Sequence, residues 1–215
     1  MNRSFVVIAS VSCLLLSACS TVKYNTLEKI GIHKRDLLVA NVEDARDAQQ
    51  DAQEQFKDAL ERFGSVVEIE ETGLKKAYDR LSDEYDDSKD AAEDVSNEID
   101  DVEEVAEDLF AEWAKEIEEY TDANLKQNSQ NQLRSTQARY KDMLATMQES
   151  ERSMVPVLKT FRDNVLFLKH NLNAQAVGSL KGTFTNLEGD IDRLIEQMNR
   201  SIERSNQFIA EMQPG

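Results

Sequence analysis

The sequence predicts an all-α protein, built as an elongated antiparallel helical bundle or coiled coil of three to four long helices. The chain of 215 residues has only 2 prolines and 7 glycines, whereas a β-sandwich or barrel needs a turn about every 8–12 residues. Between residues 74 and 177 there is no glycine, and Pro156 is the only proline. Apolar residues also alternate at spacings of three and four over many turns, a pattern typical of a coiled-coil seam.

The first two helices are expected at 36–66 and 74–120. Gly64 and Gly73 bracket the connection between them, because glycine commonly ends a helix. The seam of the first helix comprises Leu38, Val42, Ala45, Gln49, Ala52, Phe56, Ala59, Phe63 and Val66. The seam of the second comprises Tyr78, Leu81, Tyr85, Ser88, Ala92, Val95, Ile99, Val102, Ala106, Leu109, Trp113, Glu116 and Tyr120.

The third and fourth helices are expected at 125–172 and 174–212. We place a hairpin within 121–132, since this stretch is rich in Asn and Gln and has the fewest apolar residues. Helices of 40–50 residues are about 60–75 Å long, so their antiparallel packing gives a rod. A second apolar row on the fourth helix would allow chains to pair as a homo-oligomer; it contains Ile195, Ile202 and Ile209.

The N-terminus resembles the signal peptide of a bacterial lipoprotein. Residues 5–16 form an apolar run that is too short for a permanent membrane-spanning helix. The run ends in a sequence similar to the lipobox, in which the cysteine is acylated and becomes the first residue of the mature chain: Leu16, Ser17, Ala18 and Cys19. The resemblance implies three parts: signal peptide 1–18, lipidated N-terminus and tether 19–35, and long-helix bundle 36–215.

The resemblance to lipoproteins also implies a location. The residue after the cysteine is Ser20 rather than Asp, which in enterobacterial lipoproteins directs the chain to the outer membrane, facing the periplasm. Several acyl chains anchor a protein stably, where one alone would be marginal. The mature chain would then keep no free thiol, which excludes thiol catalysis and cysteine metal ligands. An ordinary secreted protein or an uncleaved signal anchor is the alternative.

Acidic residues are concentrated on the second helix. The formal net charge is −17, and residues 79–122 alone hold 20 acidic and 3 basic side chains. An acidic chain of this kind is a poor nucleic-acid binder. The acidic stripe is either a docking surface for a basic envelope protein or for cations, or a solvated face that keeps the rod soluble, which we favour. Its residues are Asp83, Asp87, Asp90, Asp94, Asp100, Glu104 and Asp108.

The sequence contains no catalytic or metal-binding motif. Neither His33 nor His170 has a Glu three residues before it, as di-iron bundles require. No EF-hand loop, His-Glu-x-x-His helix, phosphate-binding glycine loop or nucleophile elbow occurs. We therefore expect neither an enzyme nor a cofactor or metal. Trp113 lies in the seam and is expected in the core.

Residues 165–180 hold more apolar side chains than one seam needs, which predicts a corner buried on several sides. Basic and Asn residues there suit a helix end. The residues of this packed corner are Phe167, Lys169, His170, Asn171 and Asn173. An interaction surface at the tip of the rod is the alternative.

The lipobox, Arg139-Tyr140, residues 154–158 and residues 165–177 together resemble an uncharacterised family of proteobacterial lipoproteins, a domain of unknown function of about this length. The resemblance covers most of the mature chain and implies no activity and no catalytic residues. We expect a membrane-anchored spacer, scaffold or adaptor. The alternative is a module that binds cations or a basic ligand through the acidic second helix.

Overall fold

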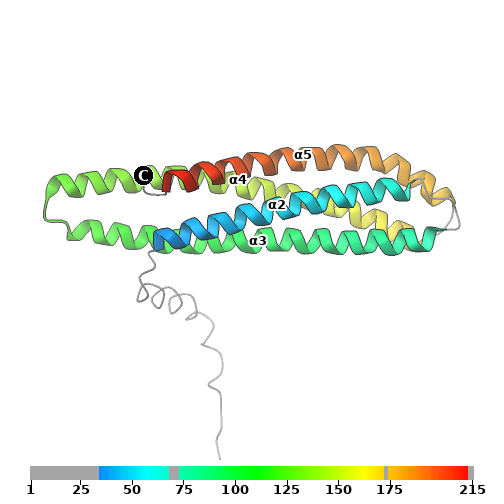
Figure 1. Ribbon diagram of the computed structural model, residues 1–215, viewed down its shortest axis with the longest axis horizontal. Helices are drawn as coiled ribbons and strands as arrows, with labels where there is room; N and C mark the ends of the chain where they lie inside the picture. Colours follow the sequence, from blue (N-terminus) through cyan, green and yellow to red (C-terminus); the bar gives the residue numbers. More distant parts are fainter. Residues whose placement is uncertain (1–33, 68–72, 172–173, 213–215) are drawn as a thin grey trace, which may run out of the picture.

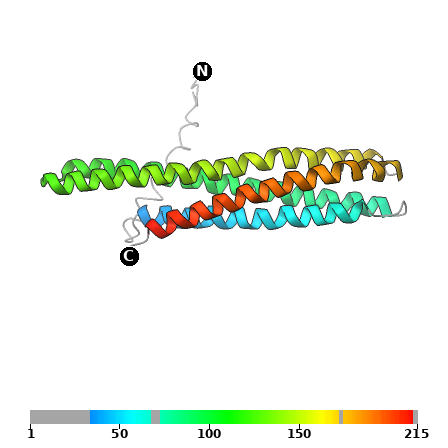
Figure 2. The same cartoon turned by 90° about the horizontal axis from the view of Figure 1, so that it is seen from above.

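The computed structural model describes residues 34–67, 73–171 and 174–212. These residues form long helices that lie side by side in one elongated bundle (Figures 1 and 2), as the sequence predicts. The signal peptide, the lipobox and most of the tether lie outside the described residues. The helices are α2 (Lys34–Val66), α3 (Leu74–Glu119), α4 (Ala123–His170) and α5 (Ala174–Met212).

Each helix packs against two neighbours. α2 and α4 both lie between α3 and α5, so the bundle is square in cross-section with α2 and α4 on one diagonal. The predicted seam of α2 is confirmed in full, because all nine of its residues are buried. Three of these nine are alanines, whose small side chains allow close approach of helices. The apolar seams exclude water along the axis, and this burial is the main force that holds the long helices together.

The four helices do not end together. α3 and α4 continue past the start of α2 and the end of α5 as an arm of two helices, which we define as residues 113–132 (Figure 1). The chain reverses at the tip of the arm between Glu119 and Ala123. This turn lies at the N-terminal end of the predicted hairpin range, 121–132. The polar residues after the turn, 123–132, are helical. In the arm a helix packs against one partner only, so most of its side chains face water and can be polar.

Asp122 fixes the start of α4. Its Oδ1 accepts hydrogen bonds from the backbone N–H groups of Asn124 (2.8 Å) and Leu125 (3.0 Å), which would otherwise lack partners. We expect Asp122→Ala to lower the free energy of unfolding by about 1 kcal/mol, the usual value of an N-cap. Chemical denaturation monitored by circular dichroism measures this loss. An Asp122→Asn variant should keep most of the stability, and equal losses in both variants would contradict the cap.

The predicted seam of α3 is wrong in the arm. Glu116 and Tyr120 are exposed, and the buried residue is instead Ile117, which is only 2% exposed. Beyond the ends of α2 and α5, α3 has one partner rather than two, so only the narrow stripe that faces α4 is buried. The apolar period alone does not reveal where a neighbouring helix stops.

Aromatic side chains fill the opposite end of the bundle. Phe63 packs edge-on against Phe161, with ring centroids 6.0 Å apart, and stacks on Phe184 at 5.9 Å. Tyr85 adds a further edge-on contact to Phe161 at 6.1 Å. Gly64 lies against this cluster, since a Cβ at its position would be 3.2 Å from the Phe184 ring. These contacts join all four helices.

The middle of the core contains polar side chains. Gln49 and Ser201 are fully buried, and their side-chain polar atoms have no hydrogen-bond partner among the described residues. The hydrogen bonds of Gln53 to Asn199 (3.0 Å) and of Arg46 to Asn206 (3.3 Å) bracket this level of the bundle. A buried amide without partners costs free energy, so this level is a weak point of the core.

Candidate functional site

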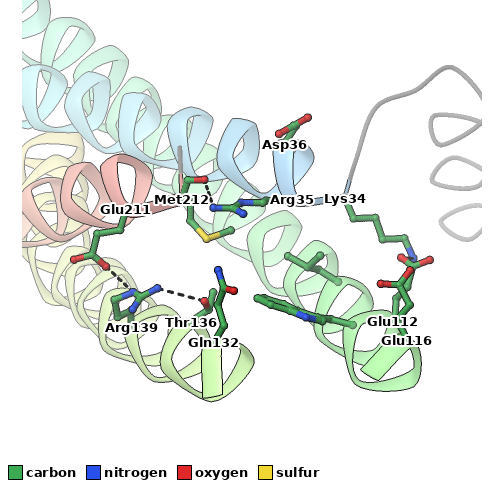
Figure 3. Close-up of a pocket in the computed structure, with 12 residues that line it drawn as sticks. Lys34, Arg35, Asp36, Glu112, Glu116, Gln132, Thr136, Arg139, Glu211 and Met212 are labelled. Carbon is green, nitrogen blue, oxygen red and sulfur yellow. Dashed lines mark hydrogen bonds and ion pairs between the residues drawn. The ribbon is translucent and has the colours of Figure 1, made fainter. Parts of the chain in front are cut away.

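A cavity lies where the four-helix section narrows to the arm (Figure 3). Its volume is about 350 Å³, and every helix contributes to its wall. The first turn of α2 and the end of α5 form one side, and α3 and α4 form the other. The apolar part of the lining is Leu109, Trp113 and Met212; the polar part is Lys34, Arg35, Asp36, Glu112, Glu116, Gln132, Thr136, Arg139 and Glu211.

Ion pairs hold the rim of this junction pocket together. Lys34 Nζ lies 3.0 Å from Glu112 Oε2, and Arg139 Nε lies 2.5 Å from Glu211 Oε2. These pairs link α2 to α3 and α4 to α5 across the pocket mouth (Figure 3). The Arg139–Glu211 pair is exposed and the Lys34–Glu112 pair is partly buried. Exposed pairs contribute little to stability, so the Arg139–Glu211 pair acts mainly by fixing the geometry of the rim.

Arg35 caps the end of α5. Its Nη2 donates a hydrogen bond to the backbone carbonyl of Met212, the last residue of that helix, where the helix dipole favours a cation. Arg35 Nε is buried and has no partner among the described residues. The pocket thus contains a buried N–H that can donate a hydrogen bond to a further carbonyl or carboxylate oxygen.

Trp113 is part of the pocket wall. The sequence predicts it in the core, but it is only partly buried, at the level of α3 where α2 begins. Its indole Nε1–H donates a hydrogen bond of 2.9 Å to Ser129 Oγ on α4. The hydrogen bond therefore holds the ring in one orientation in the wall of the pocket.

Tyr140 follows Arg139 of the pocket wall and is buried in the core. Burial raises the pKa of its hydroxyl well above the ordinary value, and the negative charges of Glu103 and Glu107 raise it further. Phe110 packs edge-on against its ring at 5.4 Å. The neutral phenol is the form that the fold stabilises.

This pKa shift predicts a loss of stability at high pH. Tyr140 ionises near pH 10 in the unfolded chain but stays neutral in the folded one, so its contribution is complete below pH 10 and falls as the pH rises above it. Urea denaturation at pH 9 and pH 11 measures the fall. The Tyr140→Phe variant should show a smaller fall between the two values. An equal fall in both proteins would contradict this assignment.

The acidic stripe becomes part of a two-helix surface. Three of its residues, Asp87, Asp90 and Asp94, line an open groove of about 690 Å³ between α2 and α3. The other four predicted stripe residues, Asp83, Asp100, Glu104 and Asp108, lie outside this groove. The remaining carboxylates of the groove come from Asp44, Asp47, Asp51 and Glu98.

The charges in this acidic groove are partly balanced by Lys89. Its Nζ lies 2.6 Å from Glu93 Oε1 and 3.9 Å from Asp90 Oδ1, and the hydrogen bond to Glu93 raises the pKa of the lysine. Among the described residues, no group of three or more His, Cys, Asp or Glu side chains is arranged to hold a metal ion. The groove is a diffuse negative surface.

The predicted packed corner is only partly buried. Val165 and Leu168 lie in the core, but Leu166 and Phe167 are exposed, so the expectation of burial on several sides is wrong for these two residues. A helix with two neighbours buries one stripe, and both residues lie outside it. Lys169 and His170 are exposed in the last turn of α4, as predicted for a helix end.

Asn171 forms the C-cap of α4. Its backbone N–H donates to the carbonyl of Leu168 (3.2 Å), and its Nδ2 donates to the carbonyl of Phe167 (2.9 Å). These two bonds satisfy carbonyl groups that the helix end leaves open. Asn173 lies outside the described residues. The corner is therefore a capped helix end with an exposed apolar face.

Comparison with known proteins places the chain in one family. The family model described as "Protein of unknown function (DUF2959)" matches residues 23–212. The chain belongs to the DUF2959 family. The match includes all four helices and the junction pocket, and it begins eleven residues before α2. No curated protein and no solved structure matches the chain.

In the described ranges, every helix is too polar or too short in its apolar stretches to cross a lipid bilayer. The junction pocket was not predicted from the sequence, because Lys34 and Arg35 fall in the predicted tether and the other lining residues come from four separate helices. The only hint was the expected seam position of Trp113.

Proposed function

We propose that this DUF2959 protein is a periplasmic lipoprotein, anchored to the outer membrane through Cys19, whose helical rod acts as a spacer, scaffold or adaptor. The lipobox resemblance supports the anchor. The shape supports the role of the rod as a spacer, scaffold or adaptor, because helices of 33–48 residues lie along one axis and the longest is about 72 Å. A rod of this length separates the partners that bind at its ends.

One observation carries the adaptor role: the large exposed apolar side chains lie toward opposite ends of α4. Leu125, 55% exposed, and Tyr120, 44% exposed, lie at the tip of the arm. Val155, Leu166 and Phe167, which are 64%, 46% and 40% exposed, lie toward the other end. Groups of apolar side chains exposed to water commonly mark interaction surfaces, whereas single ones do not.

Labelling in cells tests the anchor. A clickable palmitate analogue should label the wild-type protein and fail to label Cys19→Ala, which should also leave the membrane fraction. Cys13→Ala is the matched control and should be labelled normally, because residue 13 lies in the expected signal peptide. Absence of label from the wild-type protein would overturn the lipoprotein assignment.

Site-specific cross-linking tests the adaptor role. A photoreactive amino acid at Phe167 or at Leu125 should capture the same neighbours in repeated experiments, a different set at each position. The exposed position Glu149, between the two, is the control and should capture far less. The Phe167 neighbours should disappear when Val155 and Leu166 are changed to Asp. Equal capture at all three positions would reject an adaptor that works through its ends.

The acidic groove favours a second candidate function, the binding of cations or of a basic ligand. It places seven carboxylates from two helices along one surface, which is more than the stripe on α3 alone provides. Calorimetry with calcium, magnesium and spermidine should then show heat at millimolar ligand. The heat should fall in a variant with Asp51, Asp87 and Asp94 changed to Asn. The absence of heat with all three ligands would exclude this function.

A further inference from the structure

The junction pocket contains one cation that the fold leaves without a negative partner. Lys34 forms an ion pair with Glu112, and Arg139 forms one with Glu211. Arg35 instead donates through Nη2 to the backbone carbonyl at the end of α5. Among the described residues, no carboxylate forms an ion pair with Arg35, and its buried Nε–H has no hydrogen-bond partner.

Arg35 therefore favours a negatively charged occupant of the pocket. Hydrogen bonds to ionised groups are about twice as strong as those between neutral groups, and a buried N–H group without a partner costs free energy. The carbonyl end of α5 carries only a partial negative charge, so it does not balance the guanidinium. A carboxylate oxygen at the Nε–H of Arg35 would supply both the missing hydrogen bond and the missing charge.

The acidic side chains of the lining limit the charge of that occupant. Asp36 points away from the pocket, whereas Glu116 lies at the rim beside Glu112 (Figure 3). Glu211 lies in the wall formed by the end of α5, where it is paired with Arg139. Because like charges repel, these carboxylates disfavour an anion with several charges, such as a phosphate ester. An occupant with a single negative charge is the best match.

The rest of the wall is suited to an apolar body. Leu109 and Trp113 of α3 and Met212 of α5 form the apolar part of the lining. An apolar cavity of about 150 Å³ is large enough for benzene. The junction pocket, with a volume of about 350 Å³, therefore has room for an apolar group about twice that size. Burial of such a group would supply the hydrophobic part of the affinity.

We infer that the junction pocket binds a small organic acid. Its one carboxylate is held by Arg35, and its apolar chain or ring, of about ten non-hydrogen atoms by the same comparison of volumes, packs against Leu109, Trp113 and Met212. This inference does not depend on the proposed function, because neither the lipid anchor nor the exposed apolar side chains of α4 line the pocket.

Three probes that share one alkyl chain and differ in the head group test the inference: octanoate, octan-1-ol and octylamine. Trp113 is the only tryptophan of the chain and lines the pocket, so its fluorescence reports an occupant. In the purified full-length protein, octanoate should shift the emission to shorter wavelength until saturation. It should bind about ten-fold more tightly than octan-1-ol, since its head group is charged. Octylamine should bind no more tightly than octan-1-ol.

Arg35→Gln tests which residue holds the carboxylate. This variant should bind octanoate only as tightly as octan-1-ol, and its affinity for octan-1-ol should be unchanged. Arg152→Gln is the matched control, because Arg152 is exposed and lies outside the pocket lining, and it should bind octanoate as the wild type does. Circular dichroism shows whether the bundle of each variant is intact, and the ranking of the three probes on the wild type needs no variant.

Three results would overturn the inference. The first is the absence of saturable octanoate binding at millimolar concentration. The second is tighter binding of octylamine than of octanoate, which would assign the pocket to a cation. The third is equal affinity of the wild type and an intact Arg35→Gln variant for octanoate, which would show that Arg35 does not hold the carboxylate.

Discussion

Phe63→Ala is expected to lower the free energy of unfolding by about 3–5 kcal/mol, the usual cost of removing a buried phenylalanine side chain. The side chain is fully buried and contacts the rings of Phe161 and Phe184. Its loss removes apolar contact and leaves a cavity between three helices, which a rod with a single layer of core cannot readily close. Chemical denaturation of the purified protein measures the change.

Phe167→Ala is the matched control for this experiment. The same substitution at a residue 40% exposed leaves no cavity and should change the stability by less than about 1 kcal/mol. A small effect at Phe63 would show that the aromatic cluster rearranges and that the end of the bundle is not tightly packed. Equal large effects at both positions would show that Phe167 is covered in solution, by a partner or by another copy.

Gln49→Leu is expected to act in the opposite direction and raise the free energy of unfolding by about 1–3 kcal/mol, the range for a buried polar group without partners. Gln49 is fully buried at a seam position of α2, and neither polar atom of its amide has a partner among the described residues. Leucine has a similar volume and no polar group whose burial costs free energy. The core therefore gains apolar contact without leaving a hydrogen-bonding group unpaired.

Gln50→Leu is the control, because it makes the same change at the exposed neighbouring residue and should have little effect. Thermal denaturation of the two variants beside the wild type measures the difference. A less stable Gln49→Leu protein would show that the amide is hydrogen-bonded in solution. Gln49 would then serve to align the helices, a role known for buried polar residues in coiled coils.

Much of the fold follows from the sequence. The spacing of three and four, with few glycines and prolines, located α2 and α5 within two residues and identified every buried seam position of α2. Such agreement is expected where a helix keeps the same two neighbours along its whole length. The same face is then buried throughout, so the buried residues keep the same spacing. In α3 the period failed at Glu116 and Tyr120, which lie beyond the start of α2, where α4 is the one neighbouring helix that remains.

The candidate site depended on the tertiary structure. The sequence showed a row of acids on α3, but only the packing of α2 beside it made a groove with Asp44, Asp47 and Asp51. It placed Lys34 and Arg35 in a tether, whereas the structure places them in the wall of a pocket with Trp113. This pocket arises where helices of different length meet. The relative positions of their ends cannot be predicted from the sequence of any one helix.

By itself, the sequence determined the all-α class, the order and approximate ends of the helices, and the concentration of negative charge on α3. The tertiary structure alone decided which helices are neighbours, where the arm begins and which apolar side chains stay exposed at the ends of α4. The physical reason is one of range. Helix formation and amphipathic period depend on residues three or four apart, whereas a pocket or groove depends on side chains brought together from separate helices by burial of the whole seam.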